Sequence, residues 1–499
     1  MKKNIIKTVV LALSLVLTSC SSWLDVTPPS QIREEAQFNS VEGFQQVLIG
    51  CYMGMTDDML YGRVLSWSTI ELMAGQFVPL QASFDNDYSI SNYSYTSSNA
   101  ITYINGIWSK AYNVIANVNN ALKYIEINKS KLDNINYQII KGELLSIRAF
   151  MHFDLMRLYG LGKLNTRTDL AGKFAIPYVT TLSKEMTPQL SYKETIDLMV
   201  KDLTDAITLL EIDPVTKINP ASYYADVNID GFFNNRQQRF NYYATSLLLA
   251  KVYMWEGSSA SISKALTLAN KVIADSESKG LVTWATSTSV SNDVIMKSEH
   301  LMSLNTQNLT LKTADYFKLV IIAAGAEDIK AQYVSNSRMM SVYEAQGVGS
   351  TDYRFSKLFI PNSVILDGMN AYTPLKYYGE VTTTITKNYI PLMRIPEAYY
   401  IAAECYVKQT TPDVASALTL LNTVRQKRGI TTDLSSLSSS AVMTEIVKEY
   451  AKEFYCEGAM FFLYKRLGLE TIPDYNKTAT DEIYVLPYPS TELQMGRKQ

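Results

Sequence analysis

The chain has 499 residues, of which 47% are hydrophobic and 19% charged, and its formal net charge is −2. A chain of this length can bury one large core or a few smaller ones, and its near-neutral charge excludes a strong electrostatic attraction to nucleic acid or anionic lipid. Only two histidines accompany 34 tyrosines, which disfavours histidine-based catalysis and metal binding and suits a protein that stacks aromatic rings against a ligand.

The first twenty residues have the layout of a lipoprotein export signal. Three lysines precede an apolar stretch over residues 9–17, which is shorter than the about 20 apolar residues that span a bilayer and is typical of a cleavable signal peptide. The stretch ends in Leu-Thr-Ser-Cys20, which looks like a lipobox. We therefore predict a signal peptide over 1–19, a lipid on Cys20 and a tether over 20–36. No later apolar run approaches membrane-spanning length, so we expect a soluble body held by its lipid alone.

Helical periodicity dominates the rest of the chain. Between Ile140 and Leu158 apolar residues recur every three or four positions, the spacing that buries one face of a helix, and Gly160 follows as a helix-ending residue. Similar patterns predict helices at about 104–126, 192–211, 239–256, 261–276, 393–408, 413–428 and 440–466. The stretches at about 76–103 and 277–392 read as long loops with some strand, and loops of such length are usually functional or disordered.

Two of these helices contain an internal repeat. Residues 265–272 nearly duplicate residues 417–424, and each copy follows a helix that carries an alanine and, three residues later, a tyrosine. Small residues let two helices approach closely, as a tetratricopeptide-like hairpin requires. We predict a mostly α fold of such hairpins with long irregular loops and minor β structure. Chance similarity between two alanine- and leucine-rich helices is the alternative.

One acidic pair could suggest hydrolysis. Glu453 and Glu457 are one turn apart if the predicted helix is continuous, with about 6 Å between their Cβ atoms. Retaining glycosidases hold their carboxyl groups about 5–5.5 Å apart. Basic residues nearby, Lys452 and Arg466 among them, favour a structural role, so we predict that the protein is not an enzyme.

A second pattern resembles a metal site. Asp226, Asn228 and Asp230, followed by Gly231, match the first half of a calcium loop, with oxygen ligands at alternate positions. The twelfth position should be a bidentate glutamate and is Gln237, which loses much of the affinity. An Asn/Asp/Gly turn is the alternative. We expect no cofactor and leave a structural calcium ion open.

Several separate blocks, in the right order, resemble the SusD/RagB outer-membrane lipoproteins of Bacteroidetes. The blocks lie at 108–119, 143–160, 247–253, 422–425 and 486–489, the last reading Leu-Pro-Tyr-Pro. The resemblance covers nearly the whole chain after Cys20. It departs at His152, where family members usually carry an aromatic residue.

This resemblance implies one SusD-like domain over 37–499, anchored in the outer membrane and exposed at the cell surface. It also implies that the protein captures a nutrient, usually an oligosaccharide, and delivers it to a SusC-like TonB-dependent transporter. Because RagB-type members take peptides, a peptide ligand is the alternative. From other classes, a lipid-anchored glycoside hydrolase and a purely structural scaffold remain open.

The ligand site is expected on the loop-rich stretches. Sugar rings pack their C–H faces on aromatic rings while amides bind their hydroxyl groups, and loops on a rigid scaffold commonly carry such sites. We predict an aromatic platform formed by Tyr88, Asn92, Tyr93 and Tyr95, facing Tyr316 and Tyr333. Trp108 and Trp255 lie in helical patterns typical of a core, whereas Trp284 fits either role.

Overall fold

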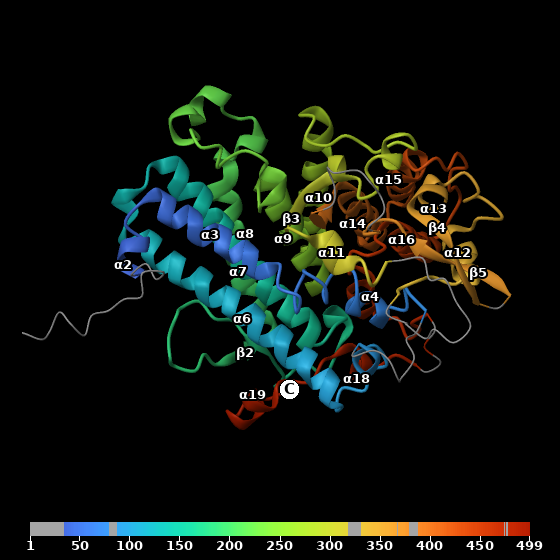
Figure 1. Cartoon of the computed structure of the whole chain (residues 1–499), viewed down its shortest axis with the longest axis horizontal. Helices are drawn as coiled ribbons and strands as arrows, with labels where there is room; N and C mark the ends of the chain where they lie inside the picture. Colours follow the sequence, from blue (N-terminus) through green and yellow to red (C-terminus); the bar gives the residue numbers. More distant parts are fainter. Residues whose placement is uncertain are drawn as a thin grey trace, which may run out of the picture.

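The computed structural model describes residues 34–78, 87–317, 331–366, 368–378, 388–473, 475 and 478–499. The predicted signal peptide, Cys20 and residues 20–33 of the predicted tether lie outside these ranges. The helices are α2 (Glu34–Gln37), α3 (Val41–Met55), α4 (Thr69–Met73), α5 (Tyr88–Ser91), α6 (Ser98–Ile127), α7 (Asn134–Tyr159), α8 (Tyr192–Leu209), α9 (Tyr242–Glu256), α10 (Ser259–Ser278), α11 (Leu309–Thr313), α12 (Asn336–Tyr343), α13 (Tyr353–Leu358), α14 (Ile395–Lys408), α15 (Val414–Lys427), α16 (Ser439–Glu453), α17 (Met460–Leu467), α18 (Asp481–Tyr484) and α19 (Ser490–Gln494). The mostly helical fold that the sequence predicts is confirmed (Figure 1).

Helix α7 lies at the centre of the N-terminal half, packed against α3, α6 and α8. Its start is capped by the side chain of Asp133, which accepts a hydrogen bond from the N–H of Asn136, and it ends at Gly160, whose N–H donates to Met156 O. This satisfies backbone groups that helix ends otherwise leave unpaired. Almost the whole helix is buried, so it serves as the scaffold on which the neighbouring helices assemble.

His152 of α7 occupies the position where the family resemblance leads us to expect an aromatic residue. Its ring stacks on Tyr178, with 4.0 Å between the ring centroids and 24° between the planes. One ring nitrogen accepts from the N–H of Val179 at 2.9 Å, so the proton lies on the other, which donates to Arg148 O at 2.8 Å. Burial lowers the pKa of His152 to about 3, and the neutral ring therefore packs as an aromatic residue would.

The predicted repeat forms two stacked helix hairpins, α9–α10 and α14–α15, with α10 packed against α14. Alanines at the crossings, Ala250 and Ala403 among them, are fully buried, which lets the helices approach closely. Between the hairpins Asn270 Nδ2 donates to the hydroxyl oxygen of Tyr406 at 3.2 Å. The tetratricopeptide-like packing of these helix pairs is therefore confirmed.

The helix predicted over 440–466 is instead two helices, α16 and α17. Between them the backbone turns through left-handed conformations at Cys456 (φ 62°) and Gly458 (φ 69°). The carboxylate of Glu71 accepts hydrogen bonds from both backbone N–H groups, at 3.1 and 2.6 Å. This contact holds the chain in a turn that the apolar spacing does not reveal.

The periodicity also fails to indicate α3. Its exposed side carries Ile49 and Met53, which are 40% and 68% exposed. Apolar residues on both sides of the helix blur the contrast on which the pattern depends.

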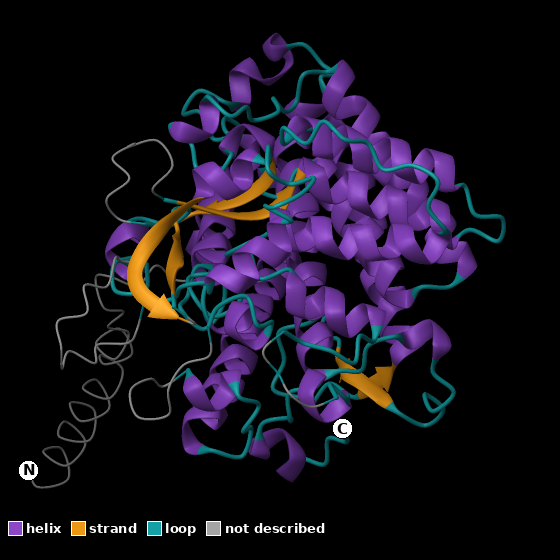
Figure 2. Cartoon of the chain, turned by 90° about the vertical axis from the view of Figure 1, so that its right-hand side faces the viewer, coloured by secondary structure: helices purple, strands orange, loops and turns teal. Residues whose placement is uncertain are grey.

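Within the described ranges the strands form three separate antiparallel pairs, β1 (Phe174–Pro177) with β2 (Gln189–Ser191), β3 (His300–Asn305) with β6 (Tyr389–Arg394), and β4 (Phe359–Leu366) with β5 (Met369–Pro374). Figure 2 shows them as small additions to the helical body. Leu304 lies opposite Ile390 in the β3–β6 pair. Most of the strand lies within residues 277–392, as predicted, together with α11, α12 and α13.

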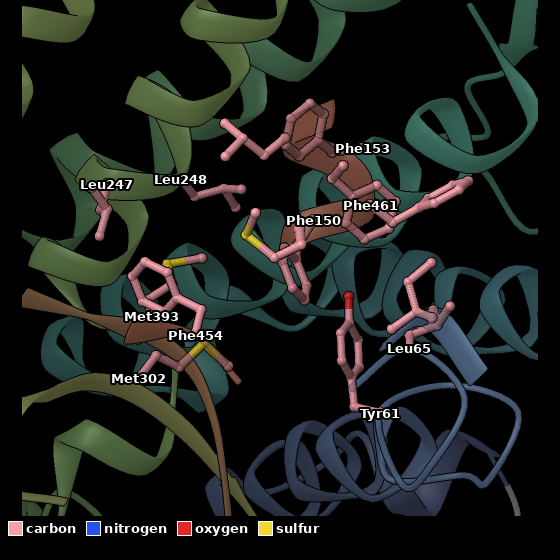
Figure 3. Packing of buried hydrophobic residues seen from close by; sticks show 14 of the residues in the cluster. Tyr61, Leu65, Phe150, Phe153, Leu247, Leu248, Met302, Met393, Phe454 and Phe461 are labelled. Carbon is pink, nitrogen blue, oxygen red and sulfur yellow. The ribbon is translucent and has the colours of Figure 1, made fainter. Parts of the chain in front are cut away.

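One hydrophobic cluster extends from Phe38 to Tyr488. Figure 3 shows three distant parts of the chain meeting in it: Tyr61 and Leu65, Phe150 and Phe153 of α7, and Phe461 of α17. Trp108 and Trp255 are buried in it, as predicted. Among the helices that the structure describes, none combines the length and apolar character needed to cross a membrane.

Buried carboxylates make the stability of this body depend on pH. Glu404 of α14 pairs with Arg466 at 2.7 Å and with Lys408 at 2.6 Å. Burial alone would raise the pKa of Glu404, but the two cations outweigh it and lower the pKa to about 2. Glu449 of α16 has a pKa lowered to about 2 in the same way, chiefly by Arg354.

Because these folded-state pKa values lie below the ordinary 4.5, the unfolded chain binds more protons in acid. The stabilisation that the carboxylates of Glu404 and Glu449 contribute to the folded state is therefore complete above about pH 4.5 and is lost as the pH falls towards 2. We expect the urea midpoint to fall steeply between about pH 4.5 and 2, and less steeply for Glu404→Gln, whose lost contribution is about 3 kcal/mol. Parallel curves for the two proteins would contradict this assignment.

Candidate functional site

The two loop-rich stretches that the sequence singles out meet beside α4. Arg63 Nη1 pairs with Asp87 at 2.9 Å, immediately before α5. Gln332 Nε2 donates to Ser68 Oγ at 2.8 Å, just before α4, and the N–H of Gln332 donates to Tyr316 O at 2.7 Å. Residues 87–93 and the described residues 316–317 and 331–333 are therefore brought close together, as the predicted platform requires.

The predicted platform residues differ in their exposure. Four tyrosines are half-buried and the asparagine is exposed: Tyr88, Tyr93, Tyr316, Tyr333 and Asn92. We call these five residues the aromatic site. The ring of Tyr316 meets the fully buried Trp67 edge-on, with 5.2 Å between the centroids. The carbonyl of Tyr333 accepts from the N–H of Val78 at 2.9 Å. Tyr88, Tyr93 and Tyr316 thus pack against the hydrophobic core, and all four tyrosines remain partly accessible.

Tyr93 is held in a strained conformation. Its φ of 59° is left-handed, which is uncommon for a bulky residue. The hydroxyl group donates to Met73 O at 2.6 Å, at the end of α4, and the ring meets Tyr475 edge-on at 4.9 Å. Backbone strain of this kind concentrates at binding and catalytic sites, where the surroundings fix it.

Tyr95 differs from the prediction. Its side chain is only 9% exposed, and its hydroxyl group donates to Ile483 O at 2.6 Å in α18. The ring fastens the loop before α6 to the C-terminal part of the chain, where it cannot present a face to a ligand. We therefore correct the predicted platform by removing Tyr95.

Asn92 ends α5 and stays exposed. Its Nδ2 donates to Tyr88 O at 2.9 Å, so the side chain is oriented by the helix it caps. No other side-chain hydrogen bond of Asn92 is formed within the described part of the chain. The oriented amide oxygen can therefore accept from a ligand hydroxyl group.

Arg63 places a positive charge beside α5, where it pairs with Asp87. Burial disfavours the charged form, but the carboxylate of Asp87 outweighs it and raises the pKa of Arg63 above its ordinary value. Asp87 also accepts from Thr69 Oγ1 at 3.1 Å, and Arg63 Nη2 donates to the Tyr103 hydroxyl group at 3.2 Å. The pair is neutral as a whole and braces the loop from which Tyr88 projects.

The supporting residues Arg63, Ser68 and Gln332 were missed by the sequence reasoning. They belong to no motif and contact their partners only after folding, so no local signal could have found them. The arrangement as a whole combines aromatic surface with amide and hydroxyl groups, which suits binding of an uncharged, hydroxyl-rich molecule.

Comparison with known proteins places this architecture in a family. Residues 22–226 match a SusD-like family model described as starch-binding and associating with the outer membrane, and residues 282–497 match the SusD family model. The chain belongs to the SusD family.

Individual relatives are distant. The SusD-like protein P38 of Formosa agariphila is 26% identical over 258 residues, a match that spans 50% of this chain and 46% of that protein. Among solved structures, a SusD superfamily protein of Bacteroides thetaiotaomicron has a TM-score of 0.67 at 19% identity, with 91% of this chain and 98% of that chain covered. Surface glycan-binding protein A of Bacteroides uniformis has a TM-score of 0.65 at 16% identity, with 91% and 97% covered. At such identities these structures establish the fold alone.

In this SusD-family protein the suspected calcium loop forms a turn. Asn228 Oδ1 accepts from the N–H of Phe233 at 2.7 Å, and Asp230 Oδ1 accepts from the N–H of Phe232 at 3.2 Å. Asp226 lies in the last turn of a short 3-10 helix over Ala221–Val227. Within the described ranges no three His, Cys, Asp or Glu side chains gather closely enough to hold a metal ion. The geometry matches the Asn/Asp/Gly turn, and calcium binding stays a prediction.

The acidic pair of the SusD-family chain is not arranged as the sequence suggested. Glu453 ends α16, whereas Glu457 lies beyond it in the turn before α17, so the two do not share a helix. Glu453 is buried among arginines, while Glu457 pairs with Lys376 and with Arg394 at 2.9 Å. Both carboxylates are committed to ion pairs, which matches the structural role expected of them.

Proposed function

We propose that this SusD-family protein binds a nutrient oligosaccharide at the aromatic site and delivers it to a SusC-like TonB-dependent transporter, while a lipid on Cys20 anchors it at the outer-membrane surface. The observation that carries the ligand part is the convergence of four half-buried tyrosines and one exposed asparagine, from two distant segments, beside α4. Support for the membrane and transport part comes from family membership.

The chemistry of the aromatic site favours a carbohydrate. A tyrosine ring offers a flat apolar face for the C–H side of a sugar and a hydroxyl group at its edge. Asn92 adds an oriented amide. Arg63 and Asp87 form an ion pair with each other, so this pair offers no net charge that would select an ionic ligand. Rigid support beneath the rings lowers the entropy cost of binding.

Calorimetry with a panel of oligosaccharides and peptides tests the proposal. We expect Tyr316→Ala and Tyr333→Ala each to weaken binding of the cognate ligand by about 1–3 kcal/mol, as truncated aromatic anchors do. Tyr223→Ala is the matched control, because Tyr223 is 42% exposed on a different surface segment, and it should bind as the wild type does.

Unchanged affinity in Tyr88→Ala, Tyr93→Ala, Tyr316→Ala, Tyr333→Ala and Asn92→Ala would place the ligand elsewhere. Tyr93→Ala is read together with its thermal midpoint, since it also removes the hydrogen bond to Met73. If the protein binds peptides and none of the oligosaccharides, its ligand is a peptide and the oligosaccharide proposal is wrong.

A further inference from the structure

Trp284 lies outside the aromatic site, in the loop that follows α10. The side chain is half-buried. The guanidinium carbon of Arg428 lies 5.4 Å from the centre of the indole ring, and Tyr399 meets the ring edge-on at 5.4 Å with 71° between the planes. Arg428 and Tyr399 are both buried, with 0% and 2% exposure. They therefore occupy the inner side of the indole and leave its outer side towards solvent.

The backbone on both sides of Trp284 is fixed. The N–H of Thr283 donates to Ser298 O at 2.9 Å, and the N–H of Ala285 donates to the carboxylate of Glu299 at 2.8 Å. Tyr353 donates its hydroxyl hydrogen to Ala285 O at 2.9 Å. An aromatic ring anchored in this way loses little freedom when a ligand stacks on it.

A surface groove of about 690 Å³ lies over this ring. Trp284 and the half-buried Val282 give the groove apolar surface, whereas its exposed lining residues are polar: Glu277, Thr283, Thr286, Ser287, Gln426 and Lys427. Gln426 uses its Nε2 to bond Asp433 at 2.8 Å, which leaves its amide oxygen as an acceptor. Lys427 takes part in none of the ion pairs found among the described residues. One acid and one base on the rim give the groove no net charge.

We propose that this groove is a second saccharide-binding site, in which a sugar ring stacks on Trp284 and its hydroxyl groups bond to the polar rim. The proposal rests on the proposed function, because it assigns a further site to the same class of ligand. A flat aromatic floor inside a rim of hydroxyl, amide and oppositely charged groups suits a molecule with an apolar ring face and hydroxyl edges. A purely apolar partner would leave that rim without hydrogen bonds.

The second site is built from other elements than the first, namely the ends of α10 and α15 and the start of α13. Two sites on one rigid body would hold a polymeric glycan more tightly than either alone, because the second contact becomes intramolecular. Short oligosaccharides should instead occupy the two sites independently.

The test uses the indole N–H signals of the full chain without its predicted signal peptide, labelled with ¹⁵N-tryptophan. The chain has five tryptophans, and Trp284→Phe identifies the signal of Trp284. The probes are linear hexasaccharides of glucose, mannose and xylose in their common linkages. We expect at least one probe to shift the Trp284 signal while the signals of the buried Trp108 and Trp255 stay in place.

Variants separate this inference from the proposed function. The shift at Trp284 should persist in Tyr316→Ala, and Trp284→Ala should lose one of two calorimetric binding events. The thermal midpoint of Trp284→Ala is measured alongside, because the substitution also removes a ring that packs on Arg428 and Tyr399. Lys427→Ala should weaken saccharide binding at Trp284 several-fold. It should not affect folding, because the side chain of Lys427 is exposed. A Trp284 signal that no probe moves, or a Trp284→Ala variant that keeps both events, overturns the second site. Loss of binding in Tyr316→Ala alongside an unmoved Trp284 signal leaves the proposed function intact and overturns only this inference.

Discussion

Replacing Glu453 with glutamine is expected to lower the free energy of unfolding by about 3–5 kcal/mol, the usual cost of removing one partner from a buried ion pair. The carboxylate of Glu453 accepts from Arg394 and Arg428 at 2.7 Å and from Arg354 at 2.8 Å, and all four side chains are 0% exposed. Glutamine preserves the shape of the side chain but carries no charge and turns an amide N–H group towards a guanidinium group. The three arginines then keep their other carboxylate partners, Asp352, Glu457 and Glu299 among them, but lose the carboxylate that they share.

Urea denaturation at neutral pH measures this loss, with Glu445→Gln as the matched control on the same helix. Glu445 pairs with Lys448 at 2.8 Å, and the lysine side chain is 40% exposed. A pair of this kind contributes less than about 1 kcal/mol. If the two variants unfold at the same urea concentration, Glu453 does not have the role assigned to it.

Replacing Cys20 with alanine is expected to release the protein from the membrane entirely. The lipid that we propose on Cys20 would hold the protein at the membrane, because acyl chains bind a bilayer through about 0.8 kcal/mol for each buried CH₂ group. The variant should fractionate as a folded soluble protein, with the same thermal midpoint as the purified wild type. Membrane fractionation followed by immunoblotting gives the readout.

The proposed transporter must be absent in this experiment, because it could hold the variant at the membrane. Retention of Cys20→Ala at the membrane in a strain that lacks the proposed transporter would contradict the lipid anchor. In a strain that has the proposed transporter, gentle detergent extraction of the wild type should recover both proteins together. Recovery of the wild type alone would leave the anchor in place and contradict delivery to the transporter.

The sequence by itself determined the helical architecture. Periodic apolar residues, the capping side chain of Asp133 and the helix end at Gly160 act over a few positions, and such local signals survive in a one-dimensional pattern. The repeated residues at 265–272 and 417–424 indicated the stacked hairpins for the same reason, because each hairpin is built from neighbouring segments. The family blocks along the chain pointed to the SusD family, which the matching family models established.

Only the tertiary structure decided where the helix predicted over 440–466 is interrupted and which tyrosines remain accessible. The turn that separates α16 from α17 is held by Glu71, which lies 385 residues before Cys456. Tyr95 is buried, and its hydroxyl group donates a hydrogen bond to Ile483, 388 residues away. Tyr93, only two positions before Tyr95, remains partly exposed. Contacts across such separations form when distant segments pack together, and alternating Ser, Asn and Tyr in a loop carries no period from which that packing could be predicted.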